Sequence, residues 1–269
     1  MLSEIITQNH QRRPLIHCIT NYVTANDCAN ILLACGGSAI MADDPDEVEE
    51  VTAMCDGLVL NMGTPNPRKI ESLLLAGMEA NRLGHPVILD PVGVGSSAMR
   101  RDAGRQLLER VRFAAIRANA TEISTLVRGT AAHRGVDADI EVLEMDAVDE
   151  NAKRLSLKTG AVVVVTGDTD IVTDGKTLYR IHNGYPMMKT VTGSGCQLSS
   201  LLGAYVTANP ENPLHAALAA VCAMGLSGEI AHERLCPLDG NASYRNYIID
   251  AIYNLTPEAL EKGAKYETD

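Results

Sequence analysis

The 269-residue sequence contains no tryptophan, only one phenylalanine and no run of basic residues. Leu, Ile, Val, Ala and Met must therefore fill the core, and a hydrophobic content of 46% is enough for a sizeable one. The net charge is −11, from 23 basic and 34 acidic residues. Because a protein that follows a phosphate backbone needs a basic surface, we expect no nucleic-acid partner.

The cysteines also lack a recognisable pattern. There are seven, an odd number, and none forms a Cys-x-x-Cys pair. A reduced, cytoplasmic setting therefore fits better than a disulfide framework or a zinc site. The first fourteen residues lack the apolar stretch of a secretory signal, and no run of about 18 apolar residues is evident, so we expect no membrane contact.

Short, continuous apolar runs alternate with segments of helical spacing along most of the chain. The expected strands are 15–20, 57–61, 87–89, 114–117, 161–165, 170–173 and 177–181. The expected helices are 27–34, 45–54, 66–83, 101–111, 120–127, 147–158, 197–205, 213–234 and 242–253. This alternation indicates an α/β fold, with a mostly parallel sheet and helices on both faces.

The sequence shows no domain boundary and no internal repeat, so we expect one domain over residues 1–269. Residues 130–146 are polar with little pattern, and we expect an irregular surface segment there. The tail from residue 262 is expected to be frayed.

The segment Val191-Thr192-Gly193-Ser194-Gly195-Cys196 is a glycine-rich turn that leads directly into an expected helix. Glycines let the backbone approach a ligand closely, and the N–H groups at a helix start attract anions. The segment therefore predicts a phosphate site with Cys196 at its rim. Neither the lysine-bearing phosphate loop nor the dinucleotide fingerprint is present, and plain packing is the alternative explanation for the glycines.

Polar residues follow several of the expected strands. They are Asp90, Arg117, Asn119, Glu122, Thr166 and Asp168. Ligands of parallel sheets bind at the carboxyl ends of the strands, so these side chains are expected to gather with Cys196 along one edge.

Each of these residues also has a structural interpretation. Asp90 could start a turn before a proline, and Arg117 could pair with a surface carboxylate. Asn119 and Glu122 have the spacing of a helix cap. Similarly, Thr166 and Asp168 could form a turn, and Cys196 could be a small buried apolar side chain.

Together, the polar residues suggest phosphoryl transfer. This reaction needs a cradle for negative charge, a divalent metal ion between phosphates and a positioned hydroxyl group. The glycine turn could supply the cradle, and Arg117 could neutralise phosphate charge. Glu122 and Asp90 offer hard oxygen ligands that suit Mg²⁺, directly or through water.

With these segments in place, residues 16 to 251 resemble the hydroxyethylthiazole kinase family of the ribokinase-like superfamily. The segments that carry the resemblance are Asn21-Tyr22-Val23-Thr24-Ala25-Asn26, Ile40-Met41-Ala42, Asn61-Met62-Gly63-Thr64, Leu89-Asp90-Pro91-Val92-Gly93, Ile116-Arg117-Ala118-Asn119-Ala120-Thr121-Glu122-Ile123, Val165-Thr166-Gly167 and the glycine turn. The set in this order is specific, although no single segment is.

The resemblance implies a single-domain, three-layer ribokinase-like sandwich. It also implies ATP- and Mg²⁺-dependent phosphorylation of the hydroxyl of 4-methyl-5-(2-hydroxyethyl)thiazole, which gives thiazole phosphate for thiamine biosynthesis and salvage. The resemblance further implies a homotrimer with its active sites between subunits. A neighbouring chain is therefore expected to contribute to the thiazole site.

The resemblance also implies a role for individual residues. The substrate-binding positions are Met41, Gly193, Asn21 and Asn26; the ATP-binding positions are Arg117, Thr166, Asn119 and Gly195; the metal-binding positions are Glu122 and Asp90; and the catalytic position is Cys196.

Cys196 marks a departure from the wider superfamily, in which most relatives place an aspartate as general base at this position. The helix start is expected to lower the pKa of the thiol from its usual value of about 8.5. We expect Cys196 to assist deprotonation without being indispensable.

Three other functions are alternatives to a thiazole kinase. They are a kinase of another vitamin-like alcohol such as hydroxymethylpyrimidine, an ADP-dependent dehydratase that repairs nicotinamide cofactors, and a non-catalytic nucleotide sensor.

Overall fold

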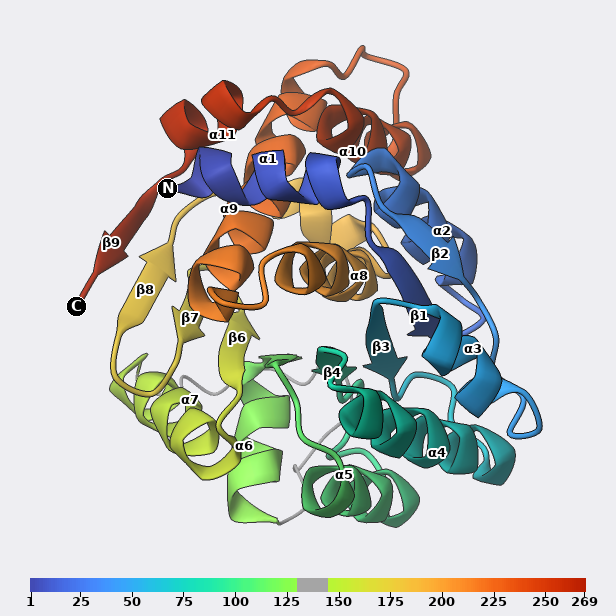
Figure 1. Ribbon diagram of the computed structural model, residues 1–269. Coiled ribbons are helices and arrows are strands. Elements are labelled where there is room, and N and C mark those ends of the chain that lie inside the picture. The colour runs from blue at the N-terminus through green and yellow to red at the C-terminus, as the bar shows by residue number, and fades with distance from the viewer. Residues whose placement is uncertain (130–144) are drawn as a thin grey trace.

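The computed structural model describes residues 1–129 and 145–269, and the strands in these ranges all join one sheet (Figure 1). The strands are β1 (Leu15–Ile19), β2 (Ser38–Ile40), β3 (Gly57–Asn61), β4 (Val87–Asp90), β5 (Ala115–Asn119), β6 (Val162–Thr166), β7 (Asp170–Thr173), β8 (Leu178–Ile181) and β9 (Tyr266–Thr268). Their order is β2-β1-β3-β4-β5-β6-β7-β8-β9. Pairing is parallel from β2 to β6 and antiparallel from β6 to β9, which confirms the mostly parallel sheet.

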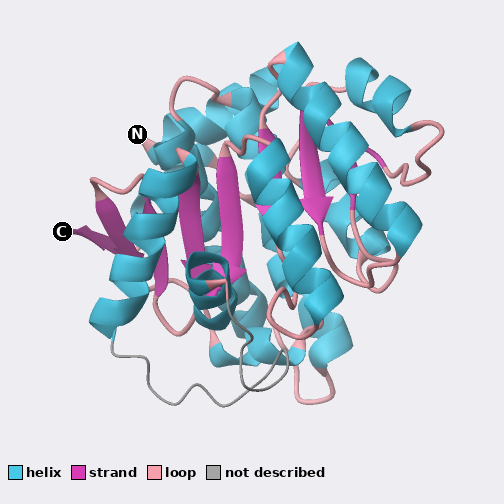
Figure 2. Ribbon diagram, turned by 90° about the horizontal axis from the view of Figure 1, so that it is seen from below, coloured by secondary structure: helices cyan, strands magenta, loops and turns pink. Residues whose placement is uncertain are grey.

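Helices cover both faces of the sheet (Figures 1 and 2). They are α1 (Leu2–Arg12), α2 (Ala25–Ala34), α3 (Val48–Met54), α4 (Pro67–Leu83), α5 (Ala98–Arg110), α6 (Ala120–Arg128), α7 (Met145–Thr159), α8 (Ser194–Ala208), α9 (Pro213–Glu233), α10 (Asn241–Asn254) and α11 (Pro257–Gly263), with a 3-10 turn η1 (Pro186–Thr190) before α8. The ribokinase-like three-layer arrangement is thus confirmed.

The two faces of the sheet belong to two separate hydrophobic clusters. Along β6, Val162 and Val164 face the cluster under α8 and α9, whereas Val163 and Val165 face the cluster over α4 to α7. Successive side chains of a strand point to opposite faces, so a strand that is covered on both sides is apolar throughout. This is why the strands read as continuous apolar runs.

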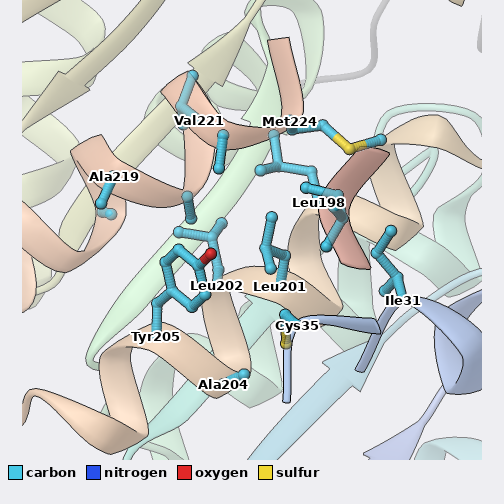
Figure 3. Close-up of a cluster of buried hydrophobic side chains, with 14 of the residues drawn as sticks. Ile31, Cys35, Leu198, Leu201, Leu202, Ala204, Tyr205, Ala219, Val221 and Met224 are labelled. Carbon is cyan, nitrogen blue, oxygen red and sulfur yellow. The ribbon is translucent and has the colours of Figure 1, made fainter. Parts of the chain in front are cut away.

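Helix α9 is the most apolar of the described helices. Its mean hydropathy of 1.5 over an 18-residue window is high enough for a membrane span by length and composition, although Ser227 and Glu229 interrupt the apolar run. However, 78% of that window is buried inside the protein. Ala219, Val221 and Met224 of α9 belong to the same hydrophobic cluster as Leu198 and Leu202 of α8 (Figure 3), as in the core helix of a globular protein.

Several elements differ from the sequence expectations. Helix α1 was missed because its polar residues hide a buried stripe of Leu2, Ile5 and Ile6. The short strand β2 and helix α11 were also missed, and the tail is not frayed, because β9 pairs with β8.

Some boundaries also differ. Helix α5 begins at Ala98 rather than at 101, because the Ser97 hydroxyl accepts the Arg100 N–H and caps it. Residues 45–47 form a turn before α3 rather than its first turn. The sequence predicts an irregular segment over residues 130–146. Residues 130–144 of this segment lie outside the described residues, and its last two residues belong to α7, which begins at Met145.

Candidate active site

The carboxyl ends of β3 to β6 bring the candidate residues to one edge of the sheet. Asn61 at the end of β3 is in register with Asp90 of β4, and Asn119 of β5 is in register with Thr166 of β6. The start of α8 lies against this edge, since Ser199 contacts Asp90. The expectation that these residues gather along one edge is therefore confirmed, except for Asp168, whose exposed side chain pairs with Lys189.

The two glycines of the turn are required by close neighbours. Gly193 caps α8 with φ of 81°, and a Cβ there would meet the methyl group of Thr24. A Cβ at Gly195 would lie 2.6 Å from the Cζ of Arg117. The packing explanation thus holds for both glycines. It does not exclude an anion site, because no described side chain caps the first turn of α8.

Arg117 lies inside the site, not in a surface pair. Its Nη2 donates to the Thr166 hydroxyl at 2.5 Å, and its Nη1 lies 3.5 Å from the Oδ1 of Asp90. Burial opposes the charge on the guanidinium, but the neighbouring carboxylates outweigh this and raise its pKa. The site therefore contains a permanent positive charge next to the start of α8.

Asp90 is fully buried, and only one of its two carboxylate oxygens accepts hydrogen bonds from the described residues. Its Oδ2 accepts hydrogen bonds from Asn61 Nδ2 and Ser199 Oγ, both at 2.8 Å. Its Oδ1 has no hydrogen-bond partner among the described residues, although Arg117 lies nearby. Burial raises the pKa of the Asp90 carboxyl, while Arg117 lowers it. Asp90 is thus part of a buried network and does more than start a turn.

Asn119 and Glu122 form a complete capping box at the start of α6. The Asn119 side chain accepts the Glu122 N–H, and the Glu122 Oε2 accepts the Asn119 N–H, each at 2.9 Å. The structural interpretation of this pair is confirmed. Glu122 also accepts the Gly93 N–H at 2.7 Å through Oε1, which ties the loop after β4 to α6. Burial raises the pKa of Glu122, and Asp90 raises it further.

These two carboxylates fit a magnesium ion that is held largely by other ligands. Asp90 offers an unpartnered oxygen, and each Glu122 oxygen keeps a second lone pair beside its backbone hydrogen bond. In residues 1–129 and 145–269, no group of three or more His, Cys, Asp or Glu side chains is arranged to hold a metal ion. Mg²⁺ commonly takes one or two carboxylates and completes its shell with water and substrate phosphates.

Cys196 lies in the first turn of α8 and is only 8% exposed. Its Sγ accepts hydrogen bonds from Asn21 Nδ2 at 3.4 Å and from Asn61 Nδ2 at 3.3 Å. Burial, followed by the charge of Asp90, raises the pKa of the thiol to about 11. The expectation that the helix start lowers this pKa is therefore wrong, because desolvation dominates.

Among the described residues, no hydrogen bond or ion pair joins three of the predicted residues to this network. Met41 follows the edge strand β2 and is 39% exposed. Asn26 is exposed on the first turn of α2 and bonds to Asn30. Asp168 is exposed and pairs with Lys189.

Three buried residues of the site were missed as individual site residues by the sequence analysis. Asn61 contacts both Asp90 and Cys196, and Ser199 contacts Asp90. Lys69 donates to the carbonyls of Thr20 and Gly63 in the loops beside them. The available signal for Asn61 was a polar residue at the end of a fully apolar strand.

The fold and the site together define a ribokinase-like kinase. The solved pyridoxal kinase from Staphylococcus aureus in complex with AMP-PCP has the same fold, with a TM-score of 0.66 at 12% identity over 95% of this chain and 97% of that chain. Closer similarity is found to a hydroxyethylthiazole kinase structure from Pyrococcus horikoshii OT3, with a TM-score of 0.88 and 30% identity over 100% of this chain and 98% of that one.

Sequence similarity identifies the family within this class of kinases. A curated hydroxyethylthiazole kinase from Clostridium acetobutylicum is 53% identical over the full length of both chains. The model of the hydroxyethylthiazole kinase family matches residues 6–258. The chain belongs to the hydroxyethylthiazole kinase family, and membership of a kinase family implies ATP as co-substrate.

Proposed function

We propose that this protein transfers the γ-phosphoryl group of ATP to the hydroxyl of 4-methyl-5-(2-hydroxyethyl)thiazole, giving thiazole phosphate for thiamine biosynthesis and salvage. The observation that carries the proposal is the partly buried Arg117 between Asp90 and Thr166, directly beside the uncapped start of α8. Positive charge and free N–H groups side by side support this proposal, because a transferring phosphoryl group develops negative charge that such groups stabilise. The family assignment supplies the acceptor alcohol.

On this proposal, the site residues share three tasks. Arg117 and the α8 start, with Gly195, neutralise phosphate charge, and Thr166 and Asn119 bind ATP nearby. The thiolate form of Cys196 receives the hydroxyl proton as the new O–P bond forms and the bond to ADP breaks. Because the pKa of the thiol is about 11, the thiol is protonated at neutral pH. Most of the rate enhancement therefore comes from positioning and charge neutralisation.

Magnesium is the metal ion that this site favours. When bound, Mg²⁺ neutralises charge on the phosphates of ATP, and Glu122 and Asp90 are the residues we propose to hold it, through water where needed. The support is the unpartnered Oδ1 of Asp90 and the proximity of the two carboxyl groups, since the charge of Asp90 adds to burial in raising the pKa of Glu122.

For the alcohol, we propose Asn21 and Gly193 from one chain, and Met41 and Asn26 where two subunits of a homotrimer meet. Met41 and Asn26 are exposed and have no contact with Cys196 in their own chain, and Tyr22 is 83% exposed in the loop before Asn26. A subunit interface would cover these side chains. Sedimentation of the purified protein tests the assembly, and a monomer would exclude it.

We further propose a reducing, cytoplasmic setting. All seven cysteines are free thiols, and six of them are buried.

The decisive experiment incubates the protein with ATP, Mg²⁺ and the thiazole alcohol, and detects thiazole phosphate by mass spectrometry. Product that disappears when the metal is chelated supports the proposal. If ATP binds but no thiazole phosphate forms, the proposal fails. The hydroxymethylpyrimidine alcohol and hydrated nicotinamide cofactors would then be assayed in the same way.

A further inference from the structure

The side chain of Asn61 uses its full hydrogen-bonding capacity at the centre of the site. Its Oδ1 accepts from Asn21 Nδ2 at 3.1 Å and from the Gly63 N–H at 2.8 Å. Its Nδ2 donates to Asp90 Oδ2 at 2.8 Å and to Cys196 Sγ at 3.3 Å. Both acceptor lone pairs and both amide protons are therefore in use.

The neighbours of Asn61 determine which way its amide points. The backbone N–H of Gly63 can only donate, so it must face the oxygen of the amide. The Oδ2 of Asp90 accepts from Ser199 Oγ as well as from this amide, so it faces the nitrogen. A flipped amide would lose both bonds, and the sulfur of Cys196 consequently always faces an N–H group.

The sulfur of Cys196 is held from two sides. Asn21 Nδ2 donates to it at 3.4 Å, in addition to the bond from Asn61. With two amide protons directed at the sulfur, its own S–H must point away from both amides. The amide of Asn61 also stands between Cys196 and Asp90, two groups that would repel each other as anions.

A buried lysine holds the loops that carry the two amides. Lys69 is 5% exposed, and its Nζ donates to Thr20 O at 2.7 Å and to Gly63 O at 2.8 Å. These carbonyls adjoin Asn21 and follow Asn61 in the loops after β1 and β3. Gly63 also leaves no room for adjustment, since a Cβ there would lie within 2.8 Å of both asparagine side chains.

We propose that Asn61 is a positioning residue for phosphoryl transfer, which holds the Cys196 sulfur in place as a hydrogen-bond acceptor and separates it from Asp90. The proposal rests on the proposed function, because it requires an alcohol whose proton the sulfur receives. Asn61 acts through Cys196 and has no assigned contact with ATP, so its loss should reduce kcat far more than it changes the KM for ATP.

The test is a double-mutant cycle with product formation as the readout. Asn61→Ala should lower kcat about 100-fold, the scale of a catalytic group displaced by about 1 Å, with less than about a threefold change in the KM for ATP. In a Cys196→Ala background, the same substitution should cost less than about twofold, because the group it positions is already gone. Equal losses in both backgrounds would overturn the proposal.

Two further variants separate positioning from folding. Asn61→Asp keeps the size of the side chain and the oxygen that accepts the Gly63 N–H, but it loses both donors, so it should fold and still lose kcat. Asn9→Ala is the matched control, since Asn9 is also fully buried and bonds to Cys35 O, but lies in α1 away from the site. It should lower the melting temperature and leave kcat unchanged. A normal kcat in Asn61→Asp would overturn the proposal.

A second readout does not depend on the substrate. Iodoacetamide alkylation, resolved by peptide mass spectrometry, should be at least about tenfold slower at Cys196 in Asn61→Asp than in the wild type, because one of the two donors to the sulfur is replaced by a repelling charge. Alkylation of the exposed Cys236 should not change. If the wild type makes no thiazole phosphate, the proposed function fails, whereas an unchanged Cys196 alkylation rate contradicts the role of Asn61 itself.

Discussion

The guanidinium of Arg117 lies against the backbone of Gly195, and a Cβ at position 195 would stand 2.6 Å from the arginine Cζ. The same guanidinium reaches Asp90 on one side and Thr166 on the other. Gly195 therefore has two consequences for the site: it lies in the first turn of α8, which no described side chain caps, and it leaves the volume that the guanidinium of Arg117 occupies.

Gly195→Ala should expel Arg117 from this position. Alanine is compatible with the helical backbone at this point, so we expect a folded protein with kcat/KM for ATP reduced about 100-fold, the scale of losing one electrostatic contact in the transition state. Steady-state kinetics would measure this. Gly240→Ala is the control, because a Cβ at Gly240 would meet nothing within 4 Å. Equal activity of the two variants would contradict the role assigned to Arg117.

Glu122→Gln should separate capping from metal binding. Glutamine has one acceptor oxygen where Glu122 uses two, so either the Gly93 or the Asn119 N–H loses its partner, at a cost of about 1 to 3 kcal/mol in the free energy of unfolding. Loss of the charge should also raise the Mg²⁺ concentration needed for half-maximal rate. A magnesium titration of product formation measures this, and an unchanged midpoint would leave Glu122 with the capping role alone.

The pH dependence of kcat should identify the contribution of Cys196. With a thiol pKa of about 11, the thiolate fraction at pH 7 is on the order of 10⁻⁴ and rises tenfold with each pH unit. If the thiolate accepts the proton, kcat should rise between pH 7 and 9. Cys196→Ala should remove this rise and retain residual activity, about 10²-fold or more below the wild type at pH 9. Parallel pH profiles would exclude Cys196 as the base.

Asp170 should make the folded protein less stable as the pH rises through 6. Burial raises the pKa of its carboxyl from 3.8 to about 6, against the opposing hydrogen bond from the Gly167 N–H. Below the unfolded pKa, both states hold the proton and nothing is lost. Above the folded pKa, the folded state carries a buried charge and has lost about 2 to 3 kcal/mol of stability.

Asp170→Asn keeps an oxygen to accept the Gly167 N–H but cannot ionise. Urea unfolding at pH 4 and pH 7 should therefore show the wild type losing about 2 kcal/mol relative to this variant across that range. A difference between the two proteins that does not change with pH would show that the Asp170 carboxyl is not perturbed.

The sequence was sufficient to predict those elements and site residues whose pattern is contained in a short stretch of chain. Strands β3 to β6 are apolar on both faces, so their ends could be located and Asp90, Arg117 and Thr166 placed at one edge. Helix α1 was missed because its polar residues outnumber the buried stripe that packs it against α8 and α9.

The thiol of Cys196 was misjudged for a different reason. A helix start is a local feature, but the desolvation that raises the pKa of the thiol comes from the segments of Asn21, Asn61 and Asp90. Asn61 was missed as a site residue on the same grounds, because its importance lies in contacts up to 135 residues away along the chain. Such contacts exist only once the sheet and α8 have come together.

The strand order has a consequence for synthesis of the chain on the ribosome. The polar edge is assembled from β1, β3, β4, β5 and β6, but it receives Cys196 and Ser199 only from α8, after residue 193. Contacts between such distant segments form late, because long loops must close first. A nascent chain that has exposed the whole parallel sheet therefore still lacks the thiol and the glycine-rich turn, and phosphoryl transfer must await the last third of translation.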